Sequence, residues 1–177
     1  RNAPVATETI AQLLDQDAFL RALFESIPCG VVVVDEDGVV QAVNDIIPQV
    51  FGPMPPPELP RRFGDIVQCL NALQSEDGCG TSKECSACPV RSAALEAVRG
   101  RRIRRSRAHL DVSGNGHRRR YQLQISAGPV EHEGRHLAVV LLEDVTELTR
   151  LRKRLKAEQS FSGIVGRAPK MQDLFDT

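Results

Sequence analysis

Four of the five cysteines in this 177-residue chain fall within one short stretch. They are Cys69, Cys79, Cys85 and Cys88, with the spacing C-x9-C-x5-C-x2-C. Zinc and iron–sulfur clusters both take thiolates in sets of four, and a two-residue gap lets neighbouring cysteines reach one metal centre. The pattern therefore predicts a metal or cluster site within residues 69–89, with these four cysteines as ligands.

Three kinds of cysteine chemistry fit this pattern. An iron–sulfur cluster, most simply [4Fe–4S], ranks first because all four candidate ligands are cysteines and Pro89 follows the last of them, as occurs at cluster sites. A structural zinc ion ranks second and would bring no redox chemistry. The third alternative is a metal-free thiol switch, in which Cys85 and Cys88 or another pair form a disulfide.

Composition and cysteine count limit the class of protein. Basic and acidic residues both number 23, so the net charge points to no particular partner. An odd number of cysteines argues against a fully paired disulfide framework and favours a reducing, cytoplasmic compartment. No apolar run is long enough to span a membrane and no secretory signal opens the sequence. The length suits one domain with flanking helices, and we expect it to be a piece of a longer protein.

The N-terminal segment shows helical spacing. Apolar side chains recur every three or four positions from Ile10 to Ile27, which predicts a helix with one apolar face. We expect a break near residues 15–17, with Asp17 capping a second segment, and an end at Pro28. Such a helix would cover its own core or pair with a second copy of the chain, and the sequence leaves both open.

Two groups of strands flank the cysteine-containing segment. Valine-rich residues 30–35 and 38–44, separated by Glu36-Asp37, predict a β-hairpin with Gly38 in the turn. Three more strand-like segments, separated by glycine-containing turns, lie at residues 103–112, 121–126 and 136–143. The predicted order is therefore two strands, helices and three strands.

The segment between these groups is expected to hold the cysteines against the core. After a short helical turn at residues 45–50 and a proline-rich stretch, residues 63–73 return to helical spacing and place Cys69 on a helix. The other three cysteines follow in a loop, and a further helix is expected at residues 90–98, after Pro89. One ligand on a helix and three on the next loop would fix a metal against the core.

This order of elements resembles a PAS sensor domain, opened here by IPCGVVVVDEDGVVQAVN and closed by LLEDVTEL. The resemblance implies an α+β fold with a five-stranded antiparallel sheet, helices on one face, flanking N-terminal and C-terminal helices, and a pocket for a cofactor or ligand. The four-cysteine insertion departs from ordinary PAS domains. It resembles a cysteine-rich subset of bacterial sensors, so we expect a cluster or zinc there rather than a flavin or haem.

The end of the resemblance suggests how a signal would leave the domain. Asp144, Val145 and Thr146 match the D-[IV]-T triplet that commonly ends the last PAS strand and starts a signalling helix. Asp144 could cap that helix, with Glu147 three residues on returning a bond to the backbone. In residues 147–160, the leucines span only about two heptads. We favour a short parallel dimer helix over a solvated linker helix.

Residues 161–177 resemble the opening of the AAA+ ATPase module of sigma-54-dependent transcription activators, F-x-x-[IL]-[IV]-G-x-S-x-x-M, with Ala168 in place of the serine. The resemblance implies a full-length ATPase that acts with RNA polymerase carrying sigma-54 and with enhancer DNA. No G-x-x-x-x-G-K-[ST] phosphate-binding loop occurs in this sequence, so we expect no enzymatic activity from the chain itself. The expected organisation is a lead at 1–19, a PAS sensor domain at 20–146, a linker helix at 147–160 and an ATPase opening at 161–177.

Other chemistry-bearing residues point less clearly to a function. Nine arginines lie between residues 99 and 120 with Asp111 as the only acid, a density that could bind nucleic acid or anionic lipid. Only Tyr121 is available nearby for stacking on bases, so a solvated strand face is the preferred interpretation. The four histidines are expected on exposed strands and turns, and Cys29 is expected to be a small buried residue.

From these observations we expect a signal-transduction domain that senses redox state or a gas through a cysteine-ligated cluster. A dimer helix would relay the signal to the ATPase module of the same chain. The alternatives are a PAS dimerisation or ligand-binding module with structural zinc, and a metal-free thiol switch.

Overall fold

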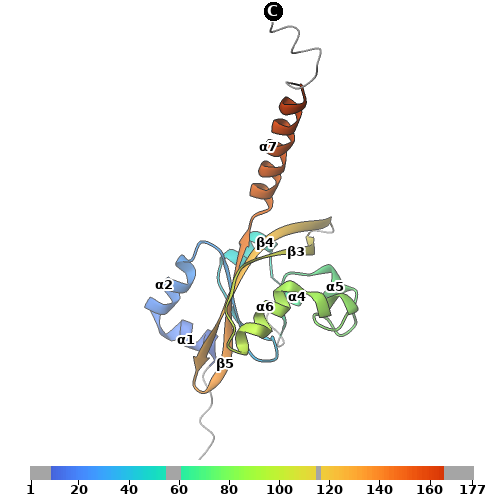
Figure 1. Ribbon diagram of the computed structural model, residues 1–177. Helices are drawn as coiled ribbons and strands as arrows, with labels where there is room; N and C mark the ends of the chain where they lie inside the picture. The colour runs from blue at the N-terminus through green and yellow to red at the C-terminus, as the bar shows by residue number, and fades with distance from the viewer. Residues whose placement is uncertain (1–8, 55–60, 115–116, 166–177) are drawn as a thin grey trace, which may run out of the picture. The chain divides into compact units, whose positions relative to one another are not determined.

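Five antiparallel strands form the single sheet of the computed structural model, which describes residues 9–54, 61–114 and 117–165 (Figure 1). Their spatial order is β2-β1-β5-β4-β3. The strands are β1 (Gly30–Val34), β2 (Val40–Val43), β3 (Ile103–Gly114), β4 (His117–His132) and β5 (Arg135–Asp144). Every residue of β1 is buried, since it lies inside the sheet between β2 and β5 and both of its faces are covered. The predicted α+β fold with a five-stranded antiparallel sheet is confirmed.

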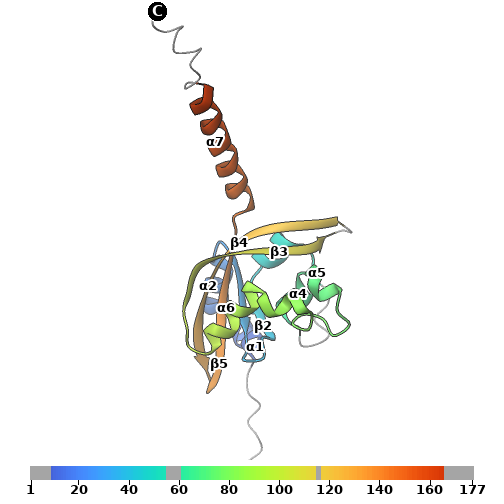
Figure 2. The same ribbon diagram turned by 45° about the vertical axis from the view of Figure 1, so that its right-hand side comes forward.

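One face of the sheet carries the helices that follow β2. They are α3 (Ile46–Phe51), α4 (Phe63–Ile66), α5 (Leu70–Leu73), the 3-10 helix η1 (Lys83–Ala87) and α6 (Pro89–Val98). Figure 2 shows α6 lying across the sheet, with α4 and α5 beside it. The buried alanines of α6, including Ala93 and Ala97, pack in one core with Leu123, Ile125 and Val140 of the sheet. Small side chains on α6 let the helix approach the strands closely.

The opposite face is covered by the N-terminal helices α1 (Ile10–Gln16) and α2 (Ala18–Ser26). Ile10, Val33 and Leu137 form a separate buried cluster there. The predicted break is confirmed: the Asp17 carboxylate accepts hydrogen bonds of 3.0 Å from the N–H groups at the start of α2. These two helices are the expected N-terminal flank of the sheet.

The expected continuous helix over residues 63–73 is wrong, because it is interrupted between α4 and α5. Gln68 adopts a left-handed backbone conformation (φ 54), and the Ser113 N–H donates to its carbonyl oxygen at 2.9 Å. Cys69 forms a β-bridge with Val112 of β3. Pairing with the sheet edge thus replaces helical hydrogen bonds, and Cys69 lies at the N-terminal end of α5 instead of within a helix.

Residues 145–177 form a separate unit, of which the structure describes α7 (Thr146–Val165). This helix covers the predicted linker helix and continues to Val165. Leu148, Leu151 and Leu155 are 46%, 51% and 58% exposed. The expected ATPase opening beyond Val165, the N-terminal lead before Thr9 and the Asn115-Gly116 turn lie outside the described residues. Within the described part, no helix has the length and hydropathy to cross a membrane.

Candidate functional site

The four clustered cysteines line one cavity of about 50 Å³, the thiol cavity, between the sheet and the helices that follow β2. Val32, Val140 and Leu142 form part of its wall on the sheet side, and α6 contributes Val90 and Ala94. Cys69 and Cys85 are buried, while Cys79 and Cys88 are half-buried. Cys29, just before β1, does not line this cavity. The cavity is large enough for a few water-sized groups.

Each of the four cysteines is held by a different piece of backbone. Cys69 begins α5 and pairs with β3, as described above. Cys79 lies in the loop after α5, and Cys85 lies in η1. Cys88 is the N-terminal cap of α6, whose first residue is Pro89, as the sequence predicted. Because separate elements deliver the thiols, any group bound to all four would tie these elements together.

Asp65 and Gly64 of α4 set the position of Cys79. The Asp65 carboxylate accepts the Cys79 N–H at 2.7 Å and the Arg62 N–H at 3.2 Å. A Cβ atom on Gly64 would lie 2.7 Å from the Cys79 Sγ and 3.3 Å from the Cys69 Cβ. Residue 64 must therefore be glycine for these two cysteines to pack against α4 as they do.

Hydrogen-bond donors surround the sulfur of Cys85. Its Sγ accepts the Gly80 N–H at 3.4 Å and the Ser82 hydroxyl at 3.3 Å. Such bonds stabilise a thiolate, and hydrogen bonds to the sulfurs are among the factors that set the potential of an iron–sulfur cluster.

The pKa values of the thiols differ within the site. Burial raises the pKa of Cys69, and it raises that of Cys79 to about 11; nearby Cys85 and Cys88 add to both shifts by charge repulsion. Burial also opposes ionisation of Cys85. There the hydrogen bonds from Ser82 and Gly80, together with the Arg91 charge, outweigh burial and lower the pKa. The metal-free site thus combines one readily ionised thiol with two that hold their protons.

Two arginines supply positive charge to the same cavity. Arg62 and Arg91 both line it. The Nε of Arg91 and the Nη1 of Arg62 lie 3.4 and 3.5 Å from the position that a Cβ atom of Gly80 would take. Both guanidinium groups therefore flank the backbone just after Cys79. This charge would offset the negative charge of four thiolates around a metal or cluster.

The thiols are not gathered around a point that suits a single ion. Among the described residues, no group of three or more His, Cys, Asp or Glu side chains is placed so that it could hold a metal ion. A tetrahedral zinc site with Zn–S bonds of about 2.3 Å requires sulfurs about 3.8 Å from one another. The donor set suits a thiolate-ligated group, but the thiols would have to rearrange to hold a single zinc ion.

The strand that leads out of the domain forms part of the cavity wall. Val140 and Leu142 of β5 line the cavity, and β5 ends at Asp144, which pairs with Leu123 of β4. Val145 and Thr146 follow in the chain and begin the second unit. The predicted relay residues thus begin at the last residue of a strand that lines the thiol cavity.

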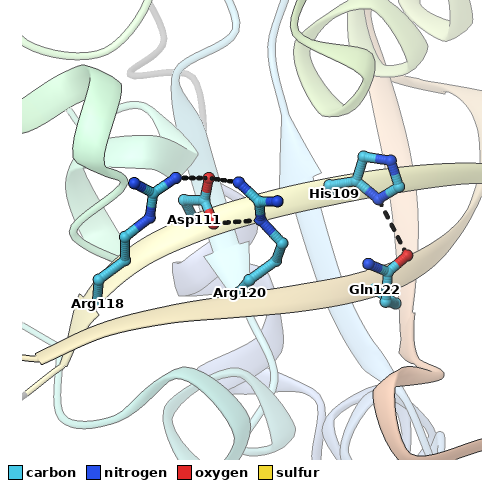
Figure 3. A network of polar contacts seen from close by, with 5 residues as sticks. All are labelled: His109, Asp111, Arg118, Arg120 and Gln122. Atoms are coloured by element: carbon cyan, nitrogen blue, oxygen red, sulfur yellow. Dashed lines mark hydrogen bonds and ion pairs between the residues drawn. The ribbon is translucent and has the colours of Figure 1, made fainter. Parts of the chain in front are cut away.

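The arginine-rich hairpin presents a different arrangement, shown in Figure 3. Asp111 of β3 accepts hydrogen bonds of 2.7 to 2.9 Å from Arg118 and Arg120 of β4. His109 Nδ1 and the Gln122 side-chain oxygen are 3.0 Å apart. All nine arginines between residues 99 and 120 are exposed. In the part of the chain that the structure describes, none of the four histidines lines the thiol cavity.

Sequence reasoning missed the residues that surround the thiols. Arg62, Gly64 and Asp65 precede the first cysteine of the site, and Ser82 and Arg91 lie among or after the others. An Arg-Phe-Gly-Asp segment so close to a cysteine cluster was the available signal, since glycine permits close approach and aspartate binds loop N–H groups. The spacing of the cysteines does not indicate which loop atoms this segment contacts.

Comparison with known proteins places the fold. The family model described as PAS fold matches residues 24–150. Similar solved structures include the PAS domain of nitrogen regulation protein NR(II) from Vibrio parahaemolyticus, which is 14% identical, with 72% of this chain and 99% of that chain covered and a TM-score of 0.50. An RNA-binding light-oxygen-voltage receptor is 16% identical, with 95% and 43% covered and a TM-score of 0.52. No curated protein matches the chain. These identities show the fold alone, and the family match over residues 24–150 shows that the chain belongs to the PAS fold family.

Proposed function

We propose that this PAS domain senses redox state or a gas through an iron–sulfur cluster, [4Fe–4S] in preference, bound by Cys69, Cys79, Cys85 and Cys88. The observation that carries the proposal is the convergence of four thiols, held by separate elements, on one cavity beside two arginines. A bound cluster would supply a centre whose charge and stability depend on oxidant. The protein's own residues hold the thiolates, donate hydrogen bonds to Cys85 and supply compensating charge.

The common cavity of the thiols, without a preformed single-ion group among the described residues, favours a cluster over zinc. In a cluster with several irons the cysteines bind different iron atoms, so their sulfurs stand farther apart than around a single ion. The four thiols share one cavity and yet do not form a group that could hold a single ion. The shared cavity would let a cluster bind each cysteine through a different iron atom.

Loss or oxidation of the cluster would release the segment that carries Cys79 and Cys85, the cysteine loop, from the face of the sheet that α6 covers. Because β5 lines the cavity and α7 follows it in the chain, a change at the thiols would reach Asp144, Val145 and Thr146 by a short route. We propose that α7 pairs with a second copy through Leu148, Leu151 and Leu155, whose exposure is consistent with such a contact. The dimer helix would then bias an AAA+ module that acts with sigma-54, RNA polymerase and enhancer DNA in the cytoplasm.

The test is to reconstitute the chain anaerobically with ferrous iron and sulfide and then expose it to air or nitric oxide. We expect a brown protein with thiolate-to-iron charge-transfer absorption that fades on exposure, together with a change in α7 association by sedimentation. A colourless protein that binds one zinc ion per chain would exclude the cluster. The isolated chain should not hydrolyse ATP.

A second function is favoured by one observation, the lowered pKa of Cys85. A metal-free protein would use this thiol as the nucleophile of a disulfide switch, with Cys88 as the nearest partner in the sequence. In that case, metal-free protein treated with oxidised glutathione should lose two alkylatable thiols per chain and regain them with dithiothreitol. Retention of all five thiols would exclude the switch.

A further inference from the structure

The side chain of Arg62 joins the cysteine loop to the turn between β1 and β2. Its Nη1 donates to the carbonyl oxygen of Cys79 at 3.0 Å, and its Nε donates to the carbonyl oxygen of Asp37 at 3.4 Å. Arg62 also lines the thiol cavity. One guanidinium group therefore contacts two backbone segments that are far apart in the sequence. Arginine suits this role because its planar group presents several donors in a fixed geometry.

The backbone of Arg61 and Arg62 pairs with residues at the start of β2, an edge strand of the sheet. The Val40 N–H donates to the Arg61 carbonyl oxygen at 2.8 Å, and Val39 forms an antiparallel β-bridge with Arg62. The Asp65 carboxylate holds the N–H groups of both Arg62 and Cys79. Both the backbone and the guanidinium group of Arg62 form hydrogen bonds. A displacement of Cys79 would therefore be passed through Arg62 to the β1–β2 hairpin.

The turn itself is tightly bonded and transmits such a displacement. The Asp35 carboxylate accepts the N–H groups of Asp37 at 3.0 Å and Val39 at 2.9 Å, and the Gln41 side-chain amide at 2.8 Å. Strand β1, which precedes the turn, pairs with β5 from Gly30 opposite Leu142 to Val34 opposite Ala138. The turn is therefore connected through regular hydrogen bonding to the strand that ends at the relay residues.

We propose that Arg62 is a positioning residue that couples occupancy of the thiol site to the β1–β2 hairpin. The inference rests on the proposed function for the group that fills the site, but the link itself is present without it. A bound group fixes Cys79, Cys79 fixes the guanidinium of Arg62, and the guanidinium holds the Asp37 carbonyl. Linkage is reciprocal: if the bound group stabilises the turn, the ordered turn must raise the affinity for the bound group by the same factor. Loosening the turn should therefore weaken binding.

The test uses the whole chain and a matched pair of variants. Arg62→Met keeps the unbranched stem and removes the donors, whereas Arg61→Met changes a neighbouring arginine whose side chain makes no polar contact within the described residues. Hydrogen exchange is measured by mass spectrometry on peptides covering residues 35–43. The states compared are protein reconstituted with ferrous iron and sulfide, and the same protein after chelation.

In wild type and Arg61→Met, we expect slower exchange at the turn in the reconstituted state. In Arg62→Met this difference should disappear when the reconstituted and chelated states are compared for the fraction of protein that retains iron and sulfide. In metal-free protein, Arg62→Met should exchange about two- to tenfold faster at the turn and alkylate faster at Cys79, as expected for loss of hydrogen bonds with a small net effect. Asp35→Ala should speed cluster loss in wild type and have no such effect in Arg62→Met.

Failure of the cluster proposal and failure of the Arg62 link give different results. If wild type binds no iron and sulfide, the cluster proposal fails, and the metal-free comparison still decides the role of Arg62. If metal-free Arg62→Met matches wild type in turn exchange and Cys79 alkylation, the link is overturned. Arg62→Lys serves as the second variant if Arg62→Met does not fold. Lysine keeps the charge but lacks the planar group that reaches both the Cys79 and the Asp37 carbonyl oxygens, so it should show the same loss of coupling.

Discussion

The thiol cavity and the β3–β4 hairpin both concentrate reactive side chains, but they use them in opposite ways. The thiols come from separate elements, lie at least half-buried and line one cavity together with two arginines. The arginines of the hairpin lie on adjacent strands and are exposed, and two of them form ion pairs with the single carboxylate of Asp111. High density of charged or reactive residues in a sequence therefore does not identify a site. Convergence from separate elements, with burial, is the better indicator.

Filling the space beside Cys69 and Cys79 should have the largest effect on the thiol cavity. In Gly64→Ala, the added Cβ would lie 2.7 Å from the Cys79 Sγ, closer than such atoms approach. We expect loss of bound iron and a lower free energy of unfolding, by about 1–3 kcal/mol as for other overpacked sites. Iron analysis and thermal unfolding measure both. Gly128→Ala, where only the Arg102 Nη1 lies near, at 3.8 Å, is the control and should match wild type.

Raising the pH should weaken the metal-free thiol site. The folded pKa of Cys79, about 11, lies above its ordinary value of 9.0, so its contribution to stability is present below pH 9 and is lost as the pH rises through 11. We expect the free energy of unfolding to fall by about 2 kcal/mol over that range. Denaturant titrations at fixed pH values measure it. In a Cys79→Ser variant the fall should be smaller, and the remainder should come from Cys69 and Tyr121, whose pKa values burial also raises.

Removing one donor to Cys85 should change its reactivity without unfolding the site. In Ser82→Ala the 3.3 Å hydrogen bond is lost, so the pKa of Cys85 should rise and alkylation by iodoacetamide near neutral pH should slow several-fold. In reconstituted protein, loss of this bond should shift the midpoint potential to a more negative value. Ser86→Ala removes a hydroxyl that donates to the Lys83 carbonyl instead, and it should leave both measurements unchanged.

The smallest effect is expected at the hairpin. Arg120 and Arg118 hold the pKa of Asp111 well below its usual range, so its contribution to stability is present above the ordinary pKa and is lost as the solution becomes more acidic. Because the two arginines of these ion pairs are largely exposed, Asp111→Asn should cost about 1 kcal/mol or less at neutral pH. Chemical denaturation measures this, and iron content should be unaffected. A loss of iron in this variant would contradict the separation of the two regions.

Local patterns in the sequence predicted most of the fold. Asp17 caps α2 and Pro89 begins α6 as expected, because capping and proline geometry depend on a few neighbouring residues. Strand β4 is longer than predicted, His117–His132 instead of 121–126. Its ends carry arginines, Gly128 and Pro129 with no apolar alternation, and they become strand only through pairing with β3 and β5.

The sequence predicted which cysteines come together at one cavity, and it missed the residues that surround them. The four cysteines could be chosen from residue type and spacing alone. The break at Gln68 depends on a bond from Ser113, and the role of Arg62 depends on loop carbonyls at Cys79 and Asp37. Contacts between segments so far apart in the chain leave no periodic signal in the sequence.

The most direct test of the account is the amount of iron and acid-labile sulfide per chain in anaerobically prepared protein. For wild type and Cys29→Ser, we predict equal amounts of both, approaching the four of each that a [4Fe–4S] cluster contains, and we predict a marked loss for Cys69→Ser, Cys79→Ser, Cys85→Ser and Cys88→Ser. Retention of iron and sulfide in those four variants, or their absence from wild type, would contradict the assignment of the thiol cavity as a cluster site.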